Sequence, residues 1–552
     1  MTKYSGTSVY KGIASGKLQI YTRKDIDVSR APVENTEEEL RRFHMAKEVA
    51  AEQLQQLYEL AVNEVGEANA AIFSIHIMML DDFSFVSSIE NIITNMHSNA
   101  EYAVSVTGQS FYDMFLSMDD AYMQARSADV RDVCARLLTI LYGSQEEKLS
   151  SEEPAIILAD DLSPSEAVQL AKGNIVAFAT VHGSVSSHTA ILTRTMKIPA
   201  LVSTDINISP ELNGKNAIID SYDGCIYIDP DQKLIRQLER KHKEELSKTE
   251  LLKDYKGKDN ITEDGRRIKI YANVGSMEEL DDAAENDAGG VGLMRSEFIY
   301  RGKSRFPTEE ELFCTYKAAV QKMNGKEVTI RMLDVGADRG MDYYGLPEEK
   351  NPALGCRGIR YLLSRPDVFK TQLKAIYRAA PYGNVSVLYP MISTLVDVGR
   401  IRKINIEVKC ELIQSGVAFG DIRHGALIET PSAVFISDLL AREMDFLSIG
   451  TNDLAQYAMG VDRENAMMNE FFDPINIALF RMIKMTIDNA HRCRKTADIS
   501  GEMGSDPALT EIFLAMGADG LSVTPSQILP LRQKVCSTNI GKVSQDLLQQ
   551  LW

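Results

Sequence analysis

The feature that most constrains the fold of this chain is a series of eight short strand-like segments in its C-terminal half. They lie at residues 268–274, 290–295, 328–334, 385–390, 426–429, 446–450, 496–500 and 520–523. Most are separated by helical patterns, and eight such strand and helix units over about 290 residues are typical of a (β/α)₈ barrel. The sequence therefore predicts a TIM barrel over residues 261–552.

Polar and charged side chains cluster where six of these eight strands would end. The cluster comprises Asn273, Arg295, Glu297, Arg331, Asp334, Glu429, Asn452, Asp453, Ser500 and Glu502. A single charged residue at a strand end more often forms a surface salt bridge than a binding site. The loops after the strands of a TIM barrel, however, are where its active site lies. The joint placement therefore indicates an active site at that face.

The segment from Met444 to Arg463 is the most informative of these strand ends. An apolar run leads directly into Gly-Thr-Asn-Asp, so that Asn452 and Asp453 follow a buried parallel strand. An amide and a carboxylate at such a position are suited to a metal ion or a phosphate.

A smaller α/β domain is expected from residues 1–21 and 144–230. Apolar strands are expected at 155–159, 175–179, 200–202 and 217–220, with helical patterns at 163–170 and 189–196 between them. Residues 4–21 alternate in polarity and carry three glycines, which suggests two short strands around a turn.

The residues between the two segments of this α/β domain are predicted to be helical. Apolar side chains recur at helical spacing from Leu40 to Leu60, and further helical segments are expected at 68–79, 84–96 and 103–141. Residues 22–143 therefore form an inserted helical bundle in this interpretation. A charged amphipathic helix at 231–260 is expected to be a linker, which can also act as a hinge.

Charge and composition exclude several classes of partner. The formal net charge is −18, from 78 acidic and 60 basic side chains, which argues against nucleic acid and favours a basic protein partner. No stretch approaches the roughly 18 apolar residues of a membrane span, and the first residues lack signal-peptide features. The seven cysteines form no Cys-x-x-Cys pair. We expect a cytoplasmic protein without membrane insertion, disulfide framework or structural zinc.

His188 is the best nucleophile candidate in the chain. Histidine can be a neutral nucleophile near neutral pH and later a good phosphate leaving group. His188 follows Gly183 and several serines and begins a helical run, so a phosphate on it would lie near helix-terminal N–H groups. A lone histidine is usually structural. His182 nearby is better interpreted as a loop residue without a role than as an ancillary base.

The segment 444–463 resembles a signature of the enzymes that take phosphate from phosphoenolpyruvate: enzyme I of the bacterial sugar phosphotransferase system, pyruvate phosphate dikinase and phosphoenolpyruvate synthase. The segment around His188 resembles the Gly-Gly-x-x-Ser-His-Thr of enzyme I, and the similarity extends through essentially the whole chain, including residues 71–80 and 125–131. No Gly-rich phosphate loop precedes His188, which disfavours a dikinase fragment.

The resemblance to enzyme I implies a role for each candidate residue. Phosphoenolpyruvate would be held by Arg295, Arg331, Arg463 and Asn452, with Arg357 a further basic position near the substrate. Glu429 and Asp453 would hold Mg²⁺. His188, on a swivelling α/β domain, would accept the phosphate and pass it to an HPr-type carrier protein bound at the helical bundle. The family resemblance also implies a homodimer formed through the barrel.

Two departures from the family pattern affect these expectations. Ser184 and Val185 replace a glycine and a common basic residue before the histidine. Ser500 replaces the family's cysteine, which is thought to protonate the enolate left after phosphate transfer, and a serine hydroxyl is a far poorer acid than a thiol. An alternative hypothesis is therefore a slow or inactive regulatory paralogue that binds phosphoenolpyruvate.

Overall fold

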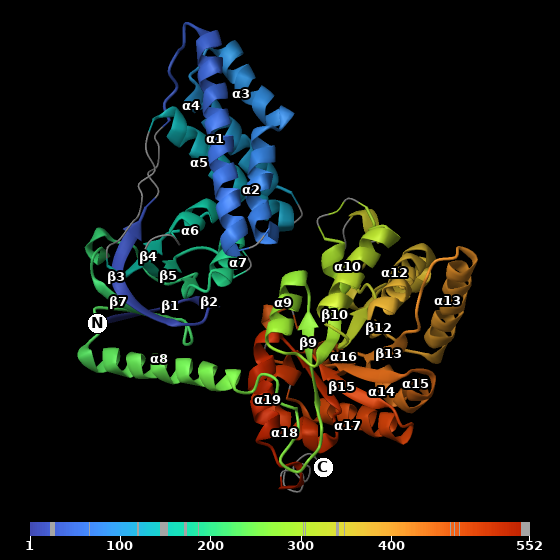
Figure 1. Cartoon of the computed structure of the whole chain (residues 1–552). Helices are drawn as coiled ribbons and strands as arrows, with labels where there is room; N and C mark the ends of the chain where they lie inside the picture. The colour runs from blue at the N-terminus through green and yellow to red at the C-terminus, as the bar shows by residue number, and fades with distance from the viewer. Residues whose placement is uncertain are drawn as a thin grey trace. The chain divides into compact units, whose positions relative to one another are not determined.

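The computed structural model divides into two compact units, Met1–Ser247 and Lys248–Trp552 (Figure 1). The structure describes residues 1–22, 28–65, 67–118, 121–143, 153–170, 174–185, 187–301, 303, 305–337, 342–346, 348–463, 465–468, 470–473 and 475–542. Residue 144, at which the α/β domain was expected to resume, lies outside the described residues.

The first unit contains an eight-stranded mixed sheet with the order β1-β8-β7-β3-β4-β5-β6-β2. Its strands are β1 (Thr2–Ser5), β2 (Thr7–Tyr10), β3 (Ile13–Tyr21), β4 (Ala155–Ala159), β5 (Ile175–Thr180), β6 (Ala200–Val202), β7 (Asn216–Asp220) and β8 (Cys225–Ile228). Helices α6 (Pro164–Leu170) and α7 (His188–Thr195) connect β4 to β5 and β5 to β6. The α/β prediction is confirmed.

The N-terminal segment differs from its prediction, because it forms three strands and not two. β1 pairs antiparallel with β8 and β2 pairs antiparallel with β6, at the two edges of the sheet. These partners lie about 200 residues away in the chain, so local alternation alone could not separate the strands. Strand β8 was also missing from the sequence-based prediction.

A bundle of five helices lies between β3 and β4 in the chain, although these two strands are parallel neighbours in the sheet. Its helices are α1 (Thr36–Val65), α2 (Glu67–Leu80), α3 (Phe83–Met96), α4 (Ala100–Leu116) and α5 (Ala121–Leu141). The single segment expected at 103–141 is wrong, because α4 ends at Leu116 and is capped by Ser117, whose backbone N–H donates to the carbonyl of Asp113. Phe43, Phe73 and Leu137 are fully buried in the core of the bundle.

Helix α8 (Gln232–Lys253) follows the sheet, within the segment expected to be a helical linker. Among the described residues no single helix is long and apolar enough to cross a membrane. Residues Ala70–Leu80 and Phe83–Met96 meet the length and composition criteria only as a pair bent by 44°.

The second unit is a closed barrel of eight parallel strands. The strands are β9 (Lys269–Val274), β10 (Gly290–Arg295), β11 (Glu327–Arg331), β12 (Val385–Tyr389), β13 (Arg423–Ile428), β14 (Phe446–Gly450), β15 (Thr496–Ser500) and β16 (Gly520–Val523). All eight predicted strands are present, and the TIM-barrel prediction is confirmed.

Helices surround the barrel strands (Figure 1). They are α9 (Met277–Glu285), α10 (Glu309–Lys322), α11 (Ile359–Ser364), α12 (Pro366–Ala379), α13 (Leu395–Gln414), α14 (Pro431–Phe435), α15 (Ser437–Glu443), α16 (Thr451–Met459), α17 (Ile477–Arg492), α18 (Pro507–Met516) and α19 (Ile528–Cys536). The large apolar core lies between these helices and the outward faces of the strands.

Alternation along the strands decides which side chains face the barrel interior. In β11, Val328 and Ile330 belong to the outer apolar core, so Arg331 is on the interior face, at the C-terminal end. In β15, Ala497 and Ile499 belong to the outer core, so Asp498 and Ser500 face inward. The interior of this barrel is therefore unusually polar for a packed TIM barrel.

Candidate active site

Polar side chains from several strands meet at the C-terminal end of the barrel, which we call the mouth. Six sequence candidates lie at or directly after a strand end: Arg295, Arg331, Glu429, Asn452, Asp453 and Ser500. Because the strands are parallel and closed into a barrel, these ends lie on one ring. Arg357 and Arg463 come from loops that follow β11 and α16.

Two buried arginines form the centre of the mouth. Arg331 is 9% exposed, and its guanidinium lies 3.0 Å from Glu297 Oε2 and 3.2 Å from Asp334 Oδ2. Arg357 is 5% exposed and lies 3.1 Å from the same Asp334 oxygen and 3.7 Å from Asp453 Oδ1. The mouth therefore holds two guanidinium groups in fixed positions, and the geometry of their N–H donors matches that of phosphate or carboxylate.

The electrostatics of the mouth keep both arginines charged. Burial by itself lowers the pKa of Arg331, but the carboxylates of Glu297 and Asp334 outweigh it and raise that pKa. The pKa of Arg357 is raised in the same way, against its burial, by Asp334 and Asp453. The two guanidinium groups therefore keep their positive charge although they are buried.

Glu429 is a strongly perturbed carboxyl at the mouth. It is 2% exposed, and its Oε2 accepts a hydrogen bond of 3.0 Å from the backbone N–H of Met391. Burial, followed by repulsion from Asp453 and Asp334, raises the pKa of Glu429 well above its usual range. Converging carboxylates whose repulsion is this strong are suited to a divalent cation.

The few carboxylates at this position are typical of an open magnesium site and not of a metal site closed by protein ligands alone. Among the described residues, no group of three or more His, Cys, Asp or Glu side chains is arranged to hold a metal ion. Mg²⁺ commonly binds one or two carboxylates together with substrate phosphates and water. Glu429 and Asp453, both of which act electrostatically on Arg357, are two carboxylates at the mouth of the kind that such a site uses.

Asn452 and Ser500 lie next to this cluster. The side-chain carbonyl of Asn452 accepts a hydrogen bond of 3.1 Å from the backbone N–H of Glu502, which orients the amide. Ser500 is 2% exposed, and its hydroxyl lies 3.2 Å from the carbonyl oxygen of Ile449 and 3.3 Å from Ser448 Oγ. Ser500 is therefore part of a buried hydroxyl pair.

Arg295 and Arg463 are less constrained than the two buried arginines. The side chain of Arg295 is 52% exposed, and its guanidinium lies 3.9 Å from Glu279 Oε2. Its guanidinium packs against Gly275, where a Cβ would lie 2.8 Å from Nη2. Arg463 is half-buried in the loop after α16, and its backbone N–H donates to Gln456 Oε1 at 3.2 Å. The structure does not bring either residue into the buried ion-pair cluster.

His188 lies in the first unit, as the first residue of α7. Ser187 caps this helix, because its hydroxyl accepts a hydrogen bond of 3.1 Å from the backbone N–H of Ala190. Thr189 Oγ1 donates to the carbonyl of Leu162 at 2.7 Å, which anchors the helix start to the loop after β4. His182 is exposed, 3.5 Å from Asp160.

The structure also identifies polar residues that were not selected from the sequence. Tyr457 lies 3.4 Å from the guanidinium of Arg357, and Asp498 lies inside the barrel below Ser500. A signal for Asp498 existed in the sequence, since a carboxylate lies between two apolar residues in the middle of the predicted strand Thr-Ala-Asp-Ile-Ser. Only barrel closure reveals that this carboxylate faces inward.

Three family models match the chain. Residues 249–540 match the PEP-binding domain of PEP-utilising enzymes, residues 5–126 match their N-terminal domain, and residues 151–224 match their mobile domain. The matches therefore cover both units.

Relatives that match this chain over nearly their whole length share one name. The chain is 40% identical to the phosphoenolpyruvate-protein phosphotransferase of Bacillus sp. (strain S), over 96% of this chain and 92% of that protein. It is 39% identical to the protein of that name from Geobacillus stearothermophilus and 36% identical to that from Bacillus subtilis (strain 168), over 98% and 99% of this chain and 95% of each relative. The resemblance inferred from the motifs is confirmed: the chain belongs to the phosphoenolpyruvate-protein phosphotransferase family, the enzyme I group of the PEP-utilising enzymes.

Proposed function

We propose that this protein transfers phosphate from phosphoenolpyruvate to His188 and then to an HPr-type carrier protein, with release of pyruvate. Such a transfer is the first step of sugar transport by a phosphotransferase system. The observation that carries the proposal is the mouth of the barrel, where buried Arg331 and Arg357 lie beside Glu429 and Asp453. Family membership over nearly the full chain supports the same reaction.

The arginines provide the binding of a small, highly charged anion. Arg331 and Arg357 are held in place by carboxylates, so they lose little freedom when the phosphate or carboxylate of phosphoenolpyruvate binds. Arg295, which is exposed, and Arg463 complete the set from the rim, and Asn452 donates its amide N–H toward the substrate in this proposal.

Glu429 and Asp453 hold Mg²⁺ in this proposal. When bound there, the ion would neutralise charge on the phosphate and on the developing enolate oxygen. The chain's own residues perform the other tasks: they align the phosphorus for in-line attack by His188 and exclude water from the buried side of the mouth. Ser500, on the inner wall, delivers the proton that converts enolate to pyruvate.

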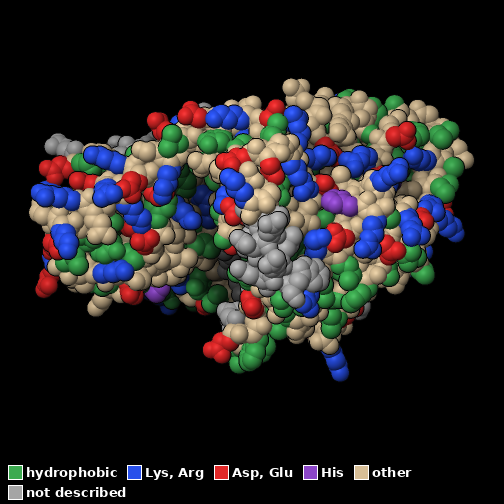
Figure 2. Space-filling model, turned by 90° about the horizontal axis from the view of Figure 1, so that it is seen from below, with side chains coloured by type: hydrophobic (Ala, Val, Ile, Leu, Met, Phe, Trp, Pro, Cys, Tyr) green, Lys and Arg blue, Asp and Glu red, His purple; other side chains and the backbone are tan. Residues whose placement is uncertain are grey.

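The partners follow from the same proposal. The phosphocarrier would dock on the helical bundle α1–α5, and a carrier with a basic surface would suit a chain of net charge −18. Acidic and basic side chains are interspersed on the face shown in Figure 2, without a continuous basic field of the kind that nucleic acid requires.

Assembly and location are also proposed. Family membership supports a homodimer formed through the barrel, whose helix α13 exposes the apolar side chains of Val396, Ile406 and Ile413. All seven cysteines are unpaired, which supports a reducing cytoplasm. Light scattering of the full-length protein with phosphoenolpyruvate and magnesium tests the dimer, and a monomer at high concentration would contradict it.

The decisive test of the function is labelling of His188. Incubation with phosphoenolpyruvate labelled at phosphorus, magnesium and an HPr-type carrier should give an acid-labile, base-stable label on the protein and then on the carrier. The His188→Ala protein should remain unlabelled, while His182→Ala serves as the matched control and keeps its label. Undiminished labelling of the His188→Ala protein would contradict the assignment.

A further inference from the structure

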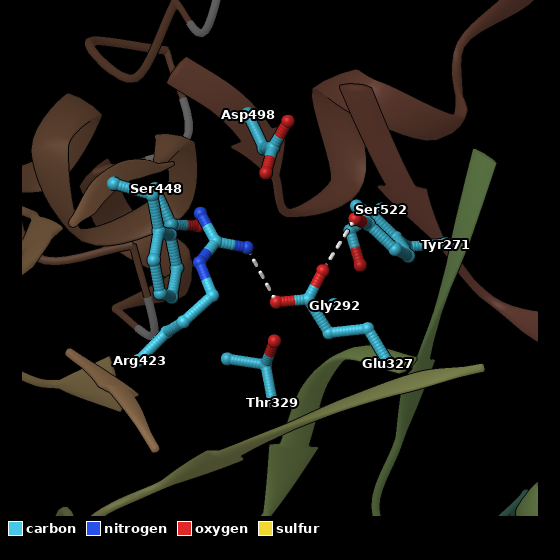
Figure 3. A pocket seen from close by; sticks show the side chains of 9 residues that line it. Tyr271, Gly292, Glu327, Thr329, Arg423, Ser448, Asp498 and Ser522 are labelled. Carbon is cyan, nitrogen blue, oxygen red and sulfur yellow. Dashed lines mark hydrogen bonds and ion pairs between the residues drawn. The ribbon is translucent and has the colours of Figure 1, made fainter. Parts of the chain in front are cut away.

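A small polar cavity lies in the barrel interior (Figure 3). Its lining residue Asp498 precedes Ser500 by two residues on β15, which places the cavity on the side of Ser500 away from the mouth. Its volume of about 10 Å³ is close to the space that one water molecule needs. It is lined by Tyr271, Gly292, Glu327, Thr329, Arg423, Phe446, Ser448, Asp498 and Ser522. Seven strands contribute to this lining, so the cavity is a built feature of the barrel.

Two of the charged groups in the cavity neutralise each other and the third does not. Glu327 accepts from Arg423 at 2.8 Å and from the hydroxyl of Tyr271 at 2.9 Å (Figure 3). Asp498 Oδ1 is shielded from solvent and has no hydrogen-bond partner among the described residues. Gly520, its register partner on β16, makes room for it, because a Cβ at 520 would lie 2.5 Å from Oδ1.

Two hydroxyl groups, those of Ser448 and Ser500, lie between the cavity and the mouth. Ser448 and Asp498 are register partners on β14 and β15, and both line the cavity. Ser448 Oγ lies 3.3 Å from Ser500 Oγ, one layer nearer the mouth. When the Ser500 hydroxyl donates to the carbonyl of Ile449 at 3.2 Å, Ser448 is the donor between the two serines, a direction that their contact allows. In that arrangement the hydrogen bond points from the cavity toward the mouth.

Burial of Asp498 favours its acid form at pH values up to about neutral. Burial raises the pKa of Asp498 to about 7, with Asp519 and Glu327 adding to the rise and Lys269 and Arg423 opposing it. The pKa of Glu327 moves the other way: burial raises it, but hydrogen bonding by Ser386 and the charge of Arg423 lower it below its usual value. Two carboxyl groups with separated pKa values in one cavity are a common acid–base arrangement.

We propose that Asp498, through one cavity water and Ser448, supplies the proton that Ser500 delivers to the enolate. This inference rests on the proposed phosphotransfer and explains how a serine can stand where the family has a cysteine. Asp498 and Ser448 do not touch the substrate and act only through Ser500.

The proton transfers balance without another reactant. The C3 carbon of the enolate takes the Ser500 hydroxyl proton as the C2–O⁻ becomes a carbonyl. Ser500 takes the Ser448 proton, Ser448 takes one from the cavity water, and the water takes the Asp498 carboxyl proton. Asp498 is left as a carboxylate and regains its proton from bulk water, which can reach it because the residue is only partly buried.

The test separates pyruvate formation from His188 labelling in the full-length protein with a carrier. Asp498→Asn and Ser448→Ala should each lower kcat for pyruvate by about 10²-fold while single-turnover labelling of His188 stays within about threefold. Thr329→Val, which changes the same cavity on β11, is the matched control and should leave both rates within about threefold of the natural protein.

Two further measurements would show no such effect if Asp498 had only a structural role. The kcat of the natural protein should fall as pH rises above about 7, where Asp498 loses its proton, and Asp498→Asn should remove that decline. In a Ser500→Cys background the cost of Asp498→Asn should shrink from about 10²-fold to less than about threefold, because a thiol is its own acid.

Several outcomes would overturn the relay. Unchanged kcat in Asp498→Asn and Ser448→Ala would refute it while leaving the proposed function intact. An equal loss in the Ser500→Cys background would show that the substitutions act on structure. If Asp498→Asn does not fold, Ser448→Ala, which keeps the carboxyl, decides alone. A natural protein that labels no histidine and forms no pyruvate would overturn the proposed function and the relay together.

Discussion

The two ends of the barrel interior handle charge in different ways. At the mouth, Arg331 and Arg357 are each paired with carboxylates within 3.2 Å, and their charges do not change at any physiological pH. In the cavity below, Glu327 and Arg423 form one pair, and Asp498 remains without a hydrogen-bond partner at Oδ1. The mouth is thus suited to binding an anion with permanent positive charges. The cavity is suited to holding a proton that can be donated.

This difference can be tested most severely at the carboxylates. Glu429→Ala or Asp453→Ala, at the mouth, should reduce labelling of His188 by at least about 10³-fold, or about 4 kcal/mol in activation free energy, because the Mg²⁺ pair is lost. Glu327→Gln, in the cavity, is the matched control and should label within about threefold. Normal labelling of both mouth variants in the presence of a chelator would refute the metal assignment.

The second prediction concerns stability at the mouth alone. Arg331→Met removes the buried counter-charge of Glu297 and one of the two arginines paired with Asp334, and should lower the free energy of unfolding by about 3 kcal/mol. Arg295→Met removes an arginine that is 52% exposed from the same mouth and should cost less than about 1 kcal/mol. Urea unfolding of the two variants measures both values, and equal losses would show that burial does not distinguish these arginines.

The third prediction uses the titration of Asp498. Its pKa is raised from 3.8 to about 7 by burial, so between these values the unfolded chain ionises while the folded barrel keeps the proton. Stability from this group is therefore fully present below pH 4 and is lost by pH 7. From pH 5 to pH 8, the natural protein should lose about 2 kcal/mol of unfolding free energy relative to Asp498→Asn. Parallel pH curves for the two proteins would contradict the raised pKa.

The sequence predicted the barrel well because its strands are short, apolar and regularly spaced. The predicted and observed bounds of β10, β14, β15 and β16 coincide. Edge strands were harder, since β1 depends on pairing with β8, which is distant in the chain. Residues at strand ends could be selected as site candidates because parallel strands bring their ends together.

The sequence could not show how those candidates interact. The pairing of Arg331 with Glu297 joins β11 to the turn after β10, and that of Arg357 with Asp453 joins two distant loops. The inward direction of Asp498 depends on the strand register and on barrel closure, neither of which a single strand encodes. For the same reason the sequence did not show that the Ser500 hydroxyl contacts Ser448.

The smallest predicted effect is the gain from restoring a thiol at Ser500, and its size sharpens the comparison between mouth and cavity. A serine that receives no proton from another group should lower the rate of pyruvate formation by the full contribution of a general acid, about 10² to 10⁴. If the cavity supplies its proton through Ser448, most of that cost is already recovered. Ser500→Cys should therefore raise kcat for pyruvate only about tenfold, while His188 labelling is unchanged because the mouth is intact.

The same substitution should have a much larger effect when the cavity cannot donate. In an Asp498→Asn background, Ser500→Cys should raise kcat by about 10³-fold, since the thiol then replaces the entire proton supply. Steady-state pyruvate assays of the four proteins, at one pH below 7 and one above, measure both gains. A gain of the same size in the two backgrounds would mean that Asp498 and Ser500 act independently. No gain in either, with a natural protein that already turns over rapidly, would mean that the proton comes from neither residue and that the mouth holds an acid of its own.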